Sequence, residues 1–218
     1  MSRIIVFGGH GRIALLLAPL LAARGDEVTG VIRNPEHSSE VEAGGARALV
    51  ADVESMDVDA LAEIIRGHDA VVWSAGAGGG SPERTYAVDR DAAQRSMDAA
   101  ERVGVRRYVM VSWIGSTADH GVPRDDSFFP YADAKWAADE HLRGTGLEGT
   151  ILAPGTLTFD DPTGRIQIDP EGRGAVSRAD VAAVIAASLQ EPCTVGRTIR
   201  FGNGDADSAA PIADALSC

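Results

Sequence analysis

The sequence predicts an α/β fold: one doubly wound parallel β-sheet with helices on both faces, forming a single domain over residues 1–218. Two observations predict it. Short apolar segments rich in Val and Ile alternate with longer helical segments along the whole chain, and parallel strands buried between helices produce that pattern. No linker, repeat or block of like charge divides the 218 residues, a length that one domain can have.

Seven short apolar runs, each bounded by Gly, charged or turn residues, are predicted as strands. They span residues 3–7, 27–32, 46–50, 70–73, 107–111, 148–152 and 198–201. Helices are predicted between them where apolar residues recur at helical spacing or follow a capping signal. These span residues 12–24, 58–66, 82–103, 131–142, 177–190 and 211–216.

Local signals set two of the helix starts and one turn. Ser81 followed by Pro82 is typical of an N-cap with proline at the first helical position. Ser177 and Asp180 resemble a capping box ahead of an apolar run. The glycine-rich tract 76–80 ends the fourth strand, which favours a turn with close backbone approach.

One long stretch shows no periodicity. Residues 160–174 are rich in Gly and Pro, so we predict a long surface loop there. Together with the residues just before it, this stretch forms an insertion over about 156–174. We expect this insertion to act as the substrate loop.

The charge and cysteine content exclude several classes of protein. Lys and Arg total 20 and Asp and Glu total 32, which gives a net charge of −12 and argues against a nucleic-acid binder. The longest apolar run, residues 13–23, is too short to span a membrane. Cys193 and Cys218 show no metal or redox spacing, so reduced thiols in a cytoplasmic protein and no metal site are expected. The expected partner is a small-molecule substrate, and the expected state is a monomer or homodimer.

A glycine-rich loop follows the first strand directly and opens the first helix. Its residues fit the pattern G-x-G-x-x-A, and with Gly8 also G-x-x-G-x-x-A; they are Gly8, Gly9, His10, Gly11, Arg12, Ile13 and Ala14. In that position glycines allow a tight turn and close approach of a pyrophosphate, and the helix N-terminus offers free N–H groups. The sequence therefore predicts a dinucleotide site, with a plain glycine-rich turn as the alternative.

The ends of the next strands indicate which cofactor the site takes. Arg33 and Asn34 follow the second strand, where an acid would bind the ribose of NAD and a base the 2′-phosphate of NADP. NADP is therefore favoured over NAD, with Arg12 as a second guanidinium; the alternative is a solvated Arg33. Asp52, beside Val53, is expected to accept from the adenine amino group or to cap the next helix. Small residues after the fourth strand are expected to line the cofactor: Ala75, Gly76 and Ala77.

A tyrosine and a lysine lie four positions apart in a predicted helix. Tyr131 and Lys135 therefore share one face. Lys135 is the only lysine among the 20 basic residues, which makes the match specific. A nearby ammonium favours the phenolate, so we expect Lys135 to lower the pKa of Tyr131 and also to donate to the cofactor ribose. The alternative is a surface lysine beside a core tyrosine.

Together these motifs resemble the short-chain dehydrogenase/reductase superfamily, in its short atypical branch labelled NAD-dependent epimerase/dehydratase-like or NAD(P)H-binding. The resemblance also rests on Val111-Ser112 and on residues 151–155. It implies a Rossmann fold with strand order 3-2-1-4-5-6-7. It implies Tyr131 as general acid/base with Lys135 and Ser112, hydride exchange at the nicotinamide, and Pro154, Gly155 and Thr156 near that ring.

One position departs from the family pattern. Trp113 stands where a second small hydroxyl residue usually polarises the substrate oxygen. Ser112 or Ser116 is then expected to replace it, or Trp113 narrows the pocket or stacks on a flat substrate. The sequence thus predicts an NADP-dependent oxidoreductase or epimerase/dehydratase-like enzyme. The alternatives are a non-catalytic NADP(H) sensor and a flavin- or quinone-type reductase that acts by hydride proximity.

Overall fold

A central β-sheet runs through the molecule in the computed structural model, which describes residues 1–79, 81–205 and 207–218. Gly80, in the predicted glycine-rich tract, lies outside the described residues. The sheet has the order β11-β8-β10-β6-β5-β4-β1-β2-β3. Its parallel strands are β1 (Arg3–Phe7), β2 (Glu27–Ile32), β3 (Ala46–Val50), β4 (Ala70–Trp73), β5 (Arg107–Val111), β6 (Glu148–Pro154) and β10 (Thr198–Gly202). The predicted fold class and strand order are therefore confirmed, with β10 as the seventh strand.

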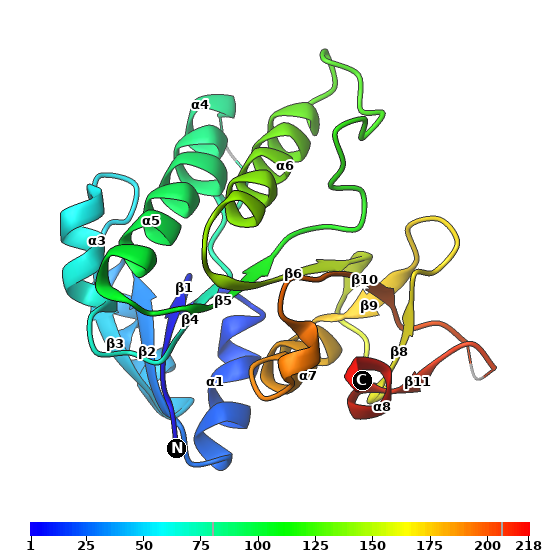
Figure 1. Cartoon of the computed structure of the whole chain (residues 1–218), viewed down its shortest axis with the longest axis horizontal. Helices are drawn as coiled ribbons and strands as arrows, with labels where there is room; N and C mark the ends of the chain where they lie inside the picture. The colour runs from blue at the N-terminus through cyan, green and yellow to red at the C-terminus, as the bar shows by residue number, and fades with distance from the viewer. Residues whose placement is uncertain (80, 206) are drawn as a thin grey trace.

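Helices cover both faces of the sheet (Figure 1). One face carries α3 (Val58–Ile65), α5 (Ala93–Val103) and α6 (Phe129–Gly144), and the other carries α1 (Ala14–Ala23) and α7 (Arg178–Ser188). Two separate apolar clusters fill the layers, one on each side of the strands. Because β1 and β4 are buried on both faces, they read in the sequence as continuous apolar runs.

The strand order reverses between β1 and β4, which are neighbours in the sheet although β2 and β3 separate them in sequence. At such a switch point the connections leave in opposite directions and open a crevice at the carboxyl ends of the strands. The glycine-rich loop after β1 and the residues after β4 therefore meet at one place.

The helix that begins at Pro82 holds an irregular segment. It starts as α4 (Pro82–Thr85), with the Ser81 hydroxyl accepting from the Arg84 N–H at 3.4 Å. It continues as η2 (Tyr86–Ala92), a π-helical stretch, before α5. π-Helical turns are rare and occur mostly at functional sites. The predicted helix 82–103 is thus present, but its π-helical segment could not be predicted from the residue pattern.

The prediction of an unstructured surface loop over residues 160–174 was wrong. Those residues include β8 (Arg165–Ile168), which pairs antiparallel with β10 and with the short β11 (Ala210–Pro211). Just before it, β7 (Thr156–Thr158) pairs with β9 (Ala175–Ser177). These strands are too short to show alternation in the sequence, and long-range pairing holds them in place.

A few short elements were also missed. They are η1 (Pro35–His37), α2 (Ser38–Ala43) and η3 (Pro192–Thr194), while the predicted terminal helix is present as α8 (Ile212–Leu216). No helix in the part of the chain that the structure describes is long and apolar enough to cross a membrane.

The buried carboxylate of Asp180 fastens the extra strands to α7. It accepts from the N–H groups of Thr163 at 3.0 Å and Gly164 at 2.8 Å, and also from the Ser177 hydroxyl and the Asn203 amide. Ser177 in return accepts from the Asp180 N–H at 3.0 Å, as an N-cap does. The second bond of the predicted capping box does not form, because the Ser177 N–H donates to the Asn203 side-chain oxygen at 2.8 Å. Burial alone would raise the pKa of Asp180, but these hydrogen bonds outweigh it and lower the pKa.

Asp180→Asn is expected to lower the free energy of unfolding by about 2–3 kcal/mol, because an amide cannot accept from all these donors and they become unsatisfied. Because the folded-state pKa of Asp180 lies below the unfolded value, its stabilising effect is full above about pH 4 and is lost as the pH falls through the folded pKa. Urea unfolding between pH 3 and 7 measures this. Asp161→Asn, on the exposed part of the same loop, is the control, and equal stability of the two variants would contradict the assignment.

Candidate functional site

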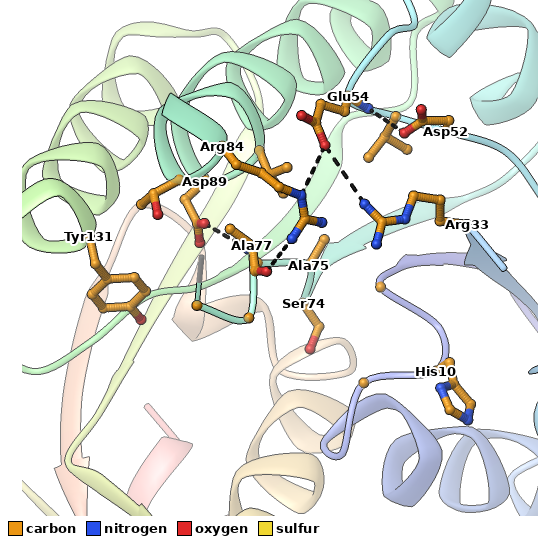
Figure 2. A pocket seen from close by; sticks show the side chains of 18 of the residues that line it. His10, Arg33, Asp52, Glu54, Ser74, Ala75, Ala77, Arg84, Asp89 and Tyr131 are labelled. Carbon is orange, nitrogen blue, oxygen red and sulfur yellow. Dashed lines mark hydrogen bonds and ion pairs between the residues drawn. The ribbon is translucent and has the colours of Figure 1, made fainter. Parts of the chain in front are cut away.

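A groove of about 780 Å³ lies at the switch point, over the carboxyl ends of β1, β2 and β4 (Figure 2). It runs from the residues after β2 past the glycine-rich loop to the start of α6. The groove brings together eleven of the residues predicted from the sequence: Gly8, His10, Gly11, Arg33, Asn34, Asp52, Val53, Ala75, Gly76, Ala77 and Tyr131. The others lie beside or beneath it: Gly9, Arg12, Ile13, Ser112, Lys135, Pro154, Gly155 and Thr156.

The glycines of the loop are required by close backbone contacts. A Cβ on Gly8, which has a φ of +79°, would lie 2.7 Å from the Ala75 Cα, and one on Gly9 would lie 2.7 Å from the Gly30 Cα. The Gly9 N–H also donates to the Val31 carbonyl oxygen at 2.8 Å. No side chain fits at these positions without moving backbone.

The same loop leaves hydrogen-bond donors free. Among the described residues, the N–H groups of His10, Arg12 and Ile13 donate to no protein oxygen, whereas the neighbouring Gly11 N–H bonds to the Gly8 carbonyl oxygen at 2.7 Å. Free N–H groups at the start of a ten-residue helix, α1, form an anion-binding turn. A pyrophosphate therefore fits this loop by the chemistry of its donors.

At the other end of the groove, Arg33 stands among charged side chains (Figure 2). Its Nη1 lies 3.9 Å from Oε2 of Glu54, and the same oxygen accepts from Nε of Arg84 at 3.3 Å. Arg84 also donates to the Ala77 carbonyl oxygen at 2.7 Å. Arg33 remains 58% exposed, so its guanidinium is open to a ligand.

The two readings of Asp52 can now be separated. The residue that caps α3 is Asp57, whose carboxylate accepts from the Ala60 N–H at 2.8 Å. Asp52 lines the groove instead, and among the described residues its carboxylate accepts only from the Glu54 N–H, at 3.3 Å. The helix-cap alternative was therefore wrong, and this carboxylate is free to meet a ligand.

His10 extends across the rim of the groove. Its ring stacks on that of His37, with centroids 3.6 Å apart, and its Nε2 lies 2.7 Å from a carboxylate oxygen of Glu40. Asn34, beside them, caps η1 by accepting from the Glu36 N–H at 3.1 Å. This end of the groove is therefore built by the short helices that the sequence analysis missed.

Asp89 is a buried carboxylate in the groove that the sequence did not reveal. It lies on the π-helical segment η2, is 2% exposed, and accepts from the Ala77 N–H at 2.9 Å. A Cβ on Gly76 would lie 3.0 Å from its Oδ1. Burial raises the pKa of Asp89, while Lys135, Ala77 and Arg84 act to lower it. Helical periodicity does not predict the burial of Asp89, because a single acid in a helix rich in charged residues is expected to be solvent-exposed.

Tyr131 closes the groove beside Phe128, with ring centroids 5.1 Å apart. Burial, together with the carboxylates of Asp89 and Asp139, raises the pKa of the Tyr131 phenol. The expectation that Lys135 lowers this pKa was wrong. The phenol is therefore held in its protonated form.

The reason lies in where Lys135 directs its ammonium. The side chain is 2% exposed, and Nζ donates to the Val111 carbonyl oxygen at 2.6 Å, at the end of β5. Burial lowers the pKa of Lys135, while Asp89 and Asp139 raise it by stabilising the cation. The only lysine of the chain is thus part of a buried charge cluster, not a surface residue.

Asp139 lies one further turn along α6, so Tyr131, Lys135 and Asp139 follow at intervals of four. Its Oδ2 accepts from the hydroxyls of Ser112 and Ser116, each at 2.5 Å. Burial raises the pKa of Asp139, and Lys135 and the two serines act to lower it. Both candidate serines are therefore buried and turned toward α6, away from the groove.

Trp113 fills space under the groove wall. It is 8% exposed, with Phe128 against its edge at 5.1 Å between centroids and the Arg173 guanidinium 5.5 Å above the ring. A Cβ on Gly115 would lie 2.2 Å from ring carbon Cζ3, so backbone presses on the indole. Stacking of a flat substrate on Trp113 is therefore blocked, and the narrowing role fits. The phenyl rings that line this end of the groove are those of Phe128, which is 37% exposed, and Tyr131.

The segment after β6 lies next to this wall. Pro154 accepts at its carbonyl from the Ile114 N–H at 2.9 Å, and the Gly155 N–H donates to the Phe201 carbonyl oxygen at 2.8 Å. A Cβ on Gly155 would lie 2.3 Å from the Arg173 carbonyl oxygen. Thr156 begins β7 and is exposed. These residues therefore lie at the carboxyl edge of the sheet without lining the groove itself.

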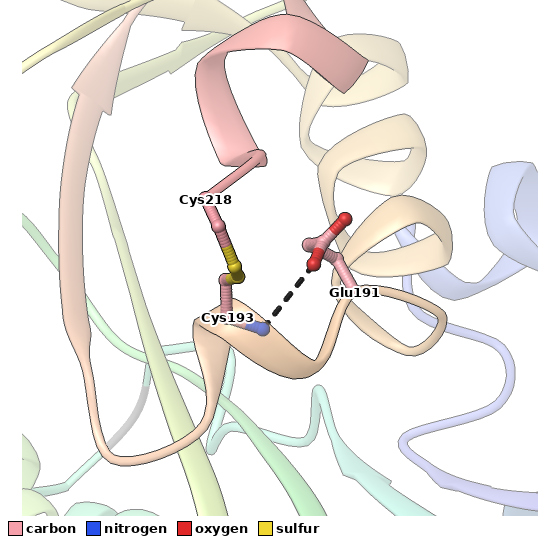
Figure 3. A group of neighbouring side chains, drawn as sticks. All are labelled: Glu191, Cys193 and Cys218. Carbon is pink, nitrogen blue, oxygen red and sulfur yellow. Dashed lines mark hydrogen bonds between the residues drawn. A yellow bond between two sulfur atoms is a disulfide. The ribbon is translucent and has the colours of Figure 1, made fainter.

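The two cysteines contradict the expectation of free thiols (Figure 3). Cys193 and Cys218 form a disulfide, with their Cα atoms 5.6 Å apart. Glu191 lies beside them, and its carboxylate accepts from the Cys193 N–H at 3.3 Å. The bond joins the end of the chain after α8 to η3, remote from the groove in sequence, so it belongs to the framework.

Comparison with known proteins gives the family. The NAD(P)H-binding family matches residues 8–192 of this chain. The uncharacterised sugar epimerase YhfK of Bacillus subtilis is 33% identical over 217 residues, and the match covers 98% of this chain and 98% of that protein.

Solved structures agree over nearly the whole chain. A protein from Bacillus halodurans described as an NAD-dependent epimerase/dehydratase has a TM-score of 0.89 and 32% identity, with 99% of each chain covered. The oxidoreductase ylbE from Lactococcus lactis has a TM-score of 0.86 and 28% identity, with 98% of this chain and 94% of that chain covered.

Proposed function

Because this chain belongs to the NAD(P)H-binding family of oxidoreductase- and epimerase-like proteins, we propose that it is an NADP-dependent oxidoreductase or epimerase/dehydratase-like enzyme of the short-chain dehydrogenase/reductase type that acts on a small molecule. One observation carries the proposal. The anion-binding loop after β1 and the protonated phenol of Tyr131 lie in the same groove. A dinucleotide that binds the loop would therefore extend toward an acid.

Residues on each side of the groove would contact such a cofactor. The N–H groups of His10, Arg12 and Ile13 would hold the pyrophosphate. Asp52 would accept from the adenine amino group, and Arg33 would hold the 2′-phosphate. When bound, the nicotinamide supplies the hydride that the protein itself lacks.

Tyr131 would act as the general acid. A tyrosine phenol is protonated at neutral pH at its usual pKa of about 10, so the hydroxyl would donate to a carbonyl oxygen as it becomes an alkoxide. Burial and the nearby carboxylates raise the pKa further, which makes the phenol a weaker acid but keeps it in the proton-donating form. In the reverse direction the phenolate would take the proton back. Asp89 lies near enough to influence both Tyr131 and Lys135 electrostatically.

The proposal is tested by NADPH oxidation against a panel of ketones, quinones and nucleotide sugars. Epimerase activity, which consumes no net cofactor, is followed on the nucleotide sugars by product analysis. Turnover with at least one class supports the assignment. Absence of binding of both NADPH and NADH by the purified chain would overturn it.

The cofactor preference gives a separate prediction. Arg33→Asp is expected to raise the Kd for NADPH by about 10–100-fold, because it removes a charge-assisted hydrogen bond worth about 1.5–3 kcal/mol and adds a like charge beside the 2′-phosphate. The Kd for NADH should change little or fall. Fluorescence titration of both cofactors measures this.

A substitution at the neighbouring Glu54 serves as a control, because it should change the Kd for NADPH in the opposite direction. Glu54 competes for the Arg33 guanidinium, so Glu54→Gln should tighten NADPH binding, whereas Arg33→Asp weakens it. Equal affinity of the parent chain for NADPH and NADH would contradict the NADP preference.

A second candidate function is a non-catalytic NADP(H) sensor. The observation that favours it is the engagement of the Ser112 hydroxyl and the Lys135 ammonium within the fold, on Asp139 and the Val111 carbonyl. A sensor would show a large ratio of affinities for NADPH and NADP⁺ and no turnover with any of the panel. Turnover would exclude it.

A further inference from the structure

We propose that Arg12, Phe159 and Arg178 form a second half of the phosphate site, which clamps the cofactor diphosphate from the side of the C-terminal segment. The inference rests on the proposed function and extends it to residues outside the glycine-rich loop. We name these three residues the arginine clamp.

The geometry of the clamp is unusual for a surface. Phe159 follows β7 and is 74% exposed. The Arg12 guanidinium carbon lies 4.9 Å from the centre of its ring, and that of Arg178 lies 4.1 Å from it. Two cations thus share one aromatic ring that is otherwise open to solvent, and the ring holds both by cation–π attraction.

The two guanidiniums lack an acidic partner. In the described ranges, no carboxylate lies within 4.0 Å of either. Arg178 donates only to the carbonyl oxygens of Leu157 at 3.2 Å and Thr158 at 2.8 Å. Burial and the like charge of Arg12 lower the pKa of Arg178. Two cations held together in a chain of net charge −12 suit a dianionic ligand.

The position of the clamp identifies that ligand. Arg12 belongs to the loop whose free N–H groups face an anion, directly before α1, and Arg178 is the first residue of α7. The helices α1 and α7 pack against each other, so the two guanidiniums flank the loop. Neutral N–H groups alone leave the two charges of a diphosphate uncompensated, and the clamp supplies the missing cations.

The sequence predicted Arg12 as a second guanidinium for the 2′-phosphate, beside Arg33. The clamp assigns Arg12 to the diphosphate instead. Arg33 meets Glu54 and Arg84, whereas Arg12 meets Phe159 and Arg178. The 2′-phosphate and the diphosphate would thus have different guanidiniums.

The test compares two ligands that differ at the diphosphate. Adenosine 2′-monophosphate keeps the adenosine and the 2′-phosphate of NADPH but has no phosphate at the 5′ end and no nicotinamide. Arg178→Gln and Arg12→Gln are each expected to raise the Kd for NADPH about tenfold and that for the monophosphate less than threefold. The dependence of the NADPH Kd on salt concentration should also become weaker.

Controls separate this from a loss of structure. Arg197→Gln removes an exposed arginine at the start of β10 and should leave both Kd values unchanged. Arg178 also donates to two backbone carbonyls, so Arg178→Gln could disturb the fold. Its effect is therefore compared with that of Arg12→Gln, because the Arg12 guanidinium makes no hydrogen bond within the described chain. NADPH affinity unchanged in both variants, or equal weakening of both ligands, would overturn the clamp while leaving the proposed function intact. Failure of the parent chain to bind NADPH would overturn both.

Discussion

Replacement of Lys135 by methionine is expected to lower the free energy of unfolding at neutral pH by up to about 3–5 kcal/mol, the effect of leaving buried charge uncompensated. The Lys135 ammonium is buried with the carboxylates of Asp89 and Asp139 and donates to the Val111 carbonyl oxygen. Without it, two buried carboxylates are left with no cation between them. Methionine has similar length, so the loss measures the charge rather than the volume.

The loss should depend on pH in a stated direction. Burial already raises the pKa of Asp89 and of Asp139, and removal of Lys135 raises them further. The folded variant therefore binds more protons than the unfolded chain, so its stability is greatest near pH 4 and falls as the pH rises through the folded pKa values. The difference between parent and variant should be small near pH 4 and large at pH 7.

Urea unfolding of the two proteins from pH 4 to 8 measures this. In the Lys135→Met background, Asp89→Asn removes one of the two unpaired charges and should recover part of the lost stability at pH 7. A Lys135→Met variant as stable as the parent at neutral pH would show that the ammonium does not neutralise these acids.

Tyr131→Phe is expected to lower turnover at saturating NADPH by about 10²–10⁴-fold, the usual contribution of a positioned general acid. The phenylalanine keeps the ring contacts with Phe128 and Trp113, so the Kd for NADPH should change less than twofold. The assay uses whichever carbonyl substrate the parent reduces fastest.

Tyr86→Phe is the matched control. Its hydroxyl donates to the carboxylate of Asp133 at 3.0 Å, but Tyr86 does not line the groove, so turnover should be retained. If Tyr131→Phe retains full turnover, the reaction proceeds by hydride proximity, without an acid from this position.

The residues at the ends of β1 and β2 could be placed from the sequence because their signals are local. A glycine-rich turn between an apolar strand and a helix has one main use, and Gly8, Gly11 and Arg33 all lie in the groove as expected. The pairing of Tyr131 with Lys135 on one helix face was also predictable, since four residues make about one turn.

What those residues contact could not be predicted. Lys135 shares a face with Tyr131, but its ammonium donates to the Val111 carbonyl oxygen at the end of β5. The carboxylates that act on it electrostatically, Asp89 and Asp139, come from the segment before α5 and from α6 itself. Such contacts depend on how the sheet and two helices pack. Local spacing places a residue on a face and does not say which charges lie across from it.

The same limit explains the missed strands. The segment over β8 pairs with β10 and β11, more than thirty residues away, and its few residues carry no pattern of their own. Asp180 holds it through backbone N–H groups, which any residue supplies. The residues 160–174 themselves contain no pattern that predicts pairing with β10 and β11.

The π-helical segment η2 has a consequence for the register of the chain. A π-helical turn accommodates an extra residue relative to an α-helix, and each residue of an α-helix advances the side-chain direction by about 100°. Deletion of one residue within Tyr86–Ala92 would allow regular winding and would turn Asp89 away from Gly76 and Ala77. The π-helical winding of η2 therefore keeps the Asp89 carboxylate facing the groove. A chain one residue shorter in this segment would have a more regular helix, and its groove would lack that carboxylate.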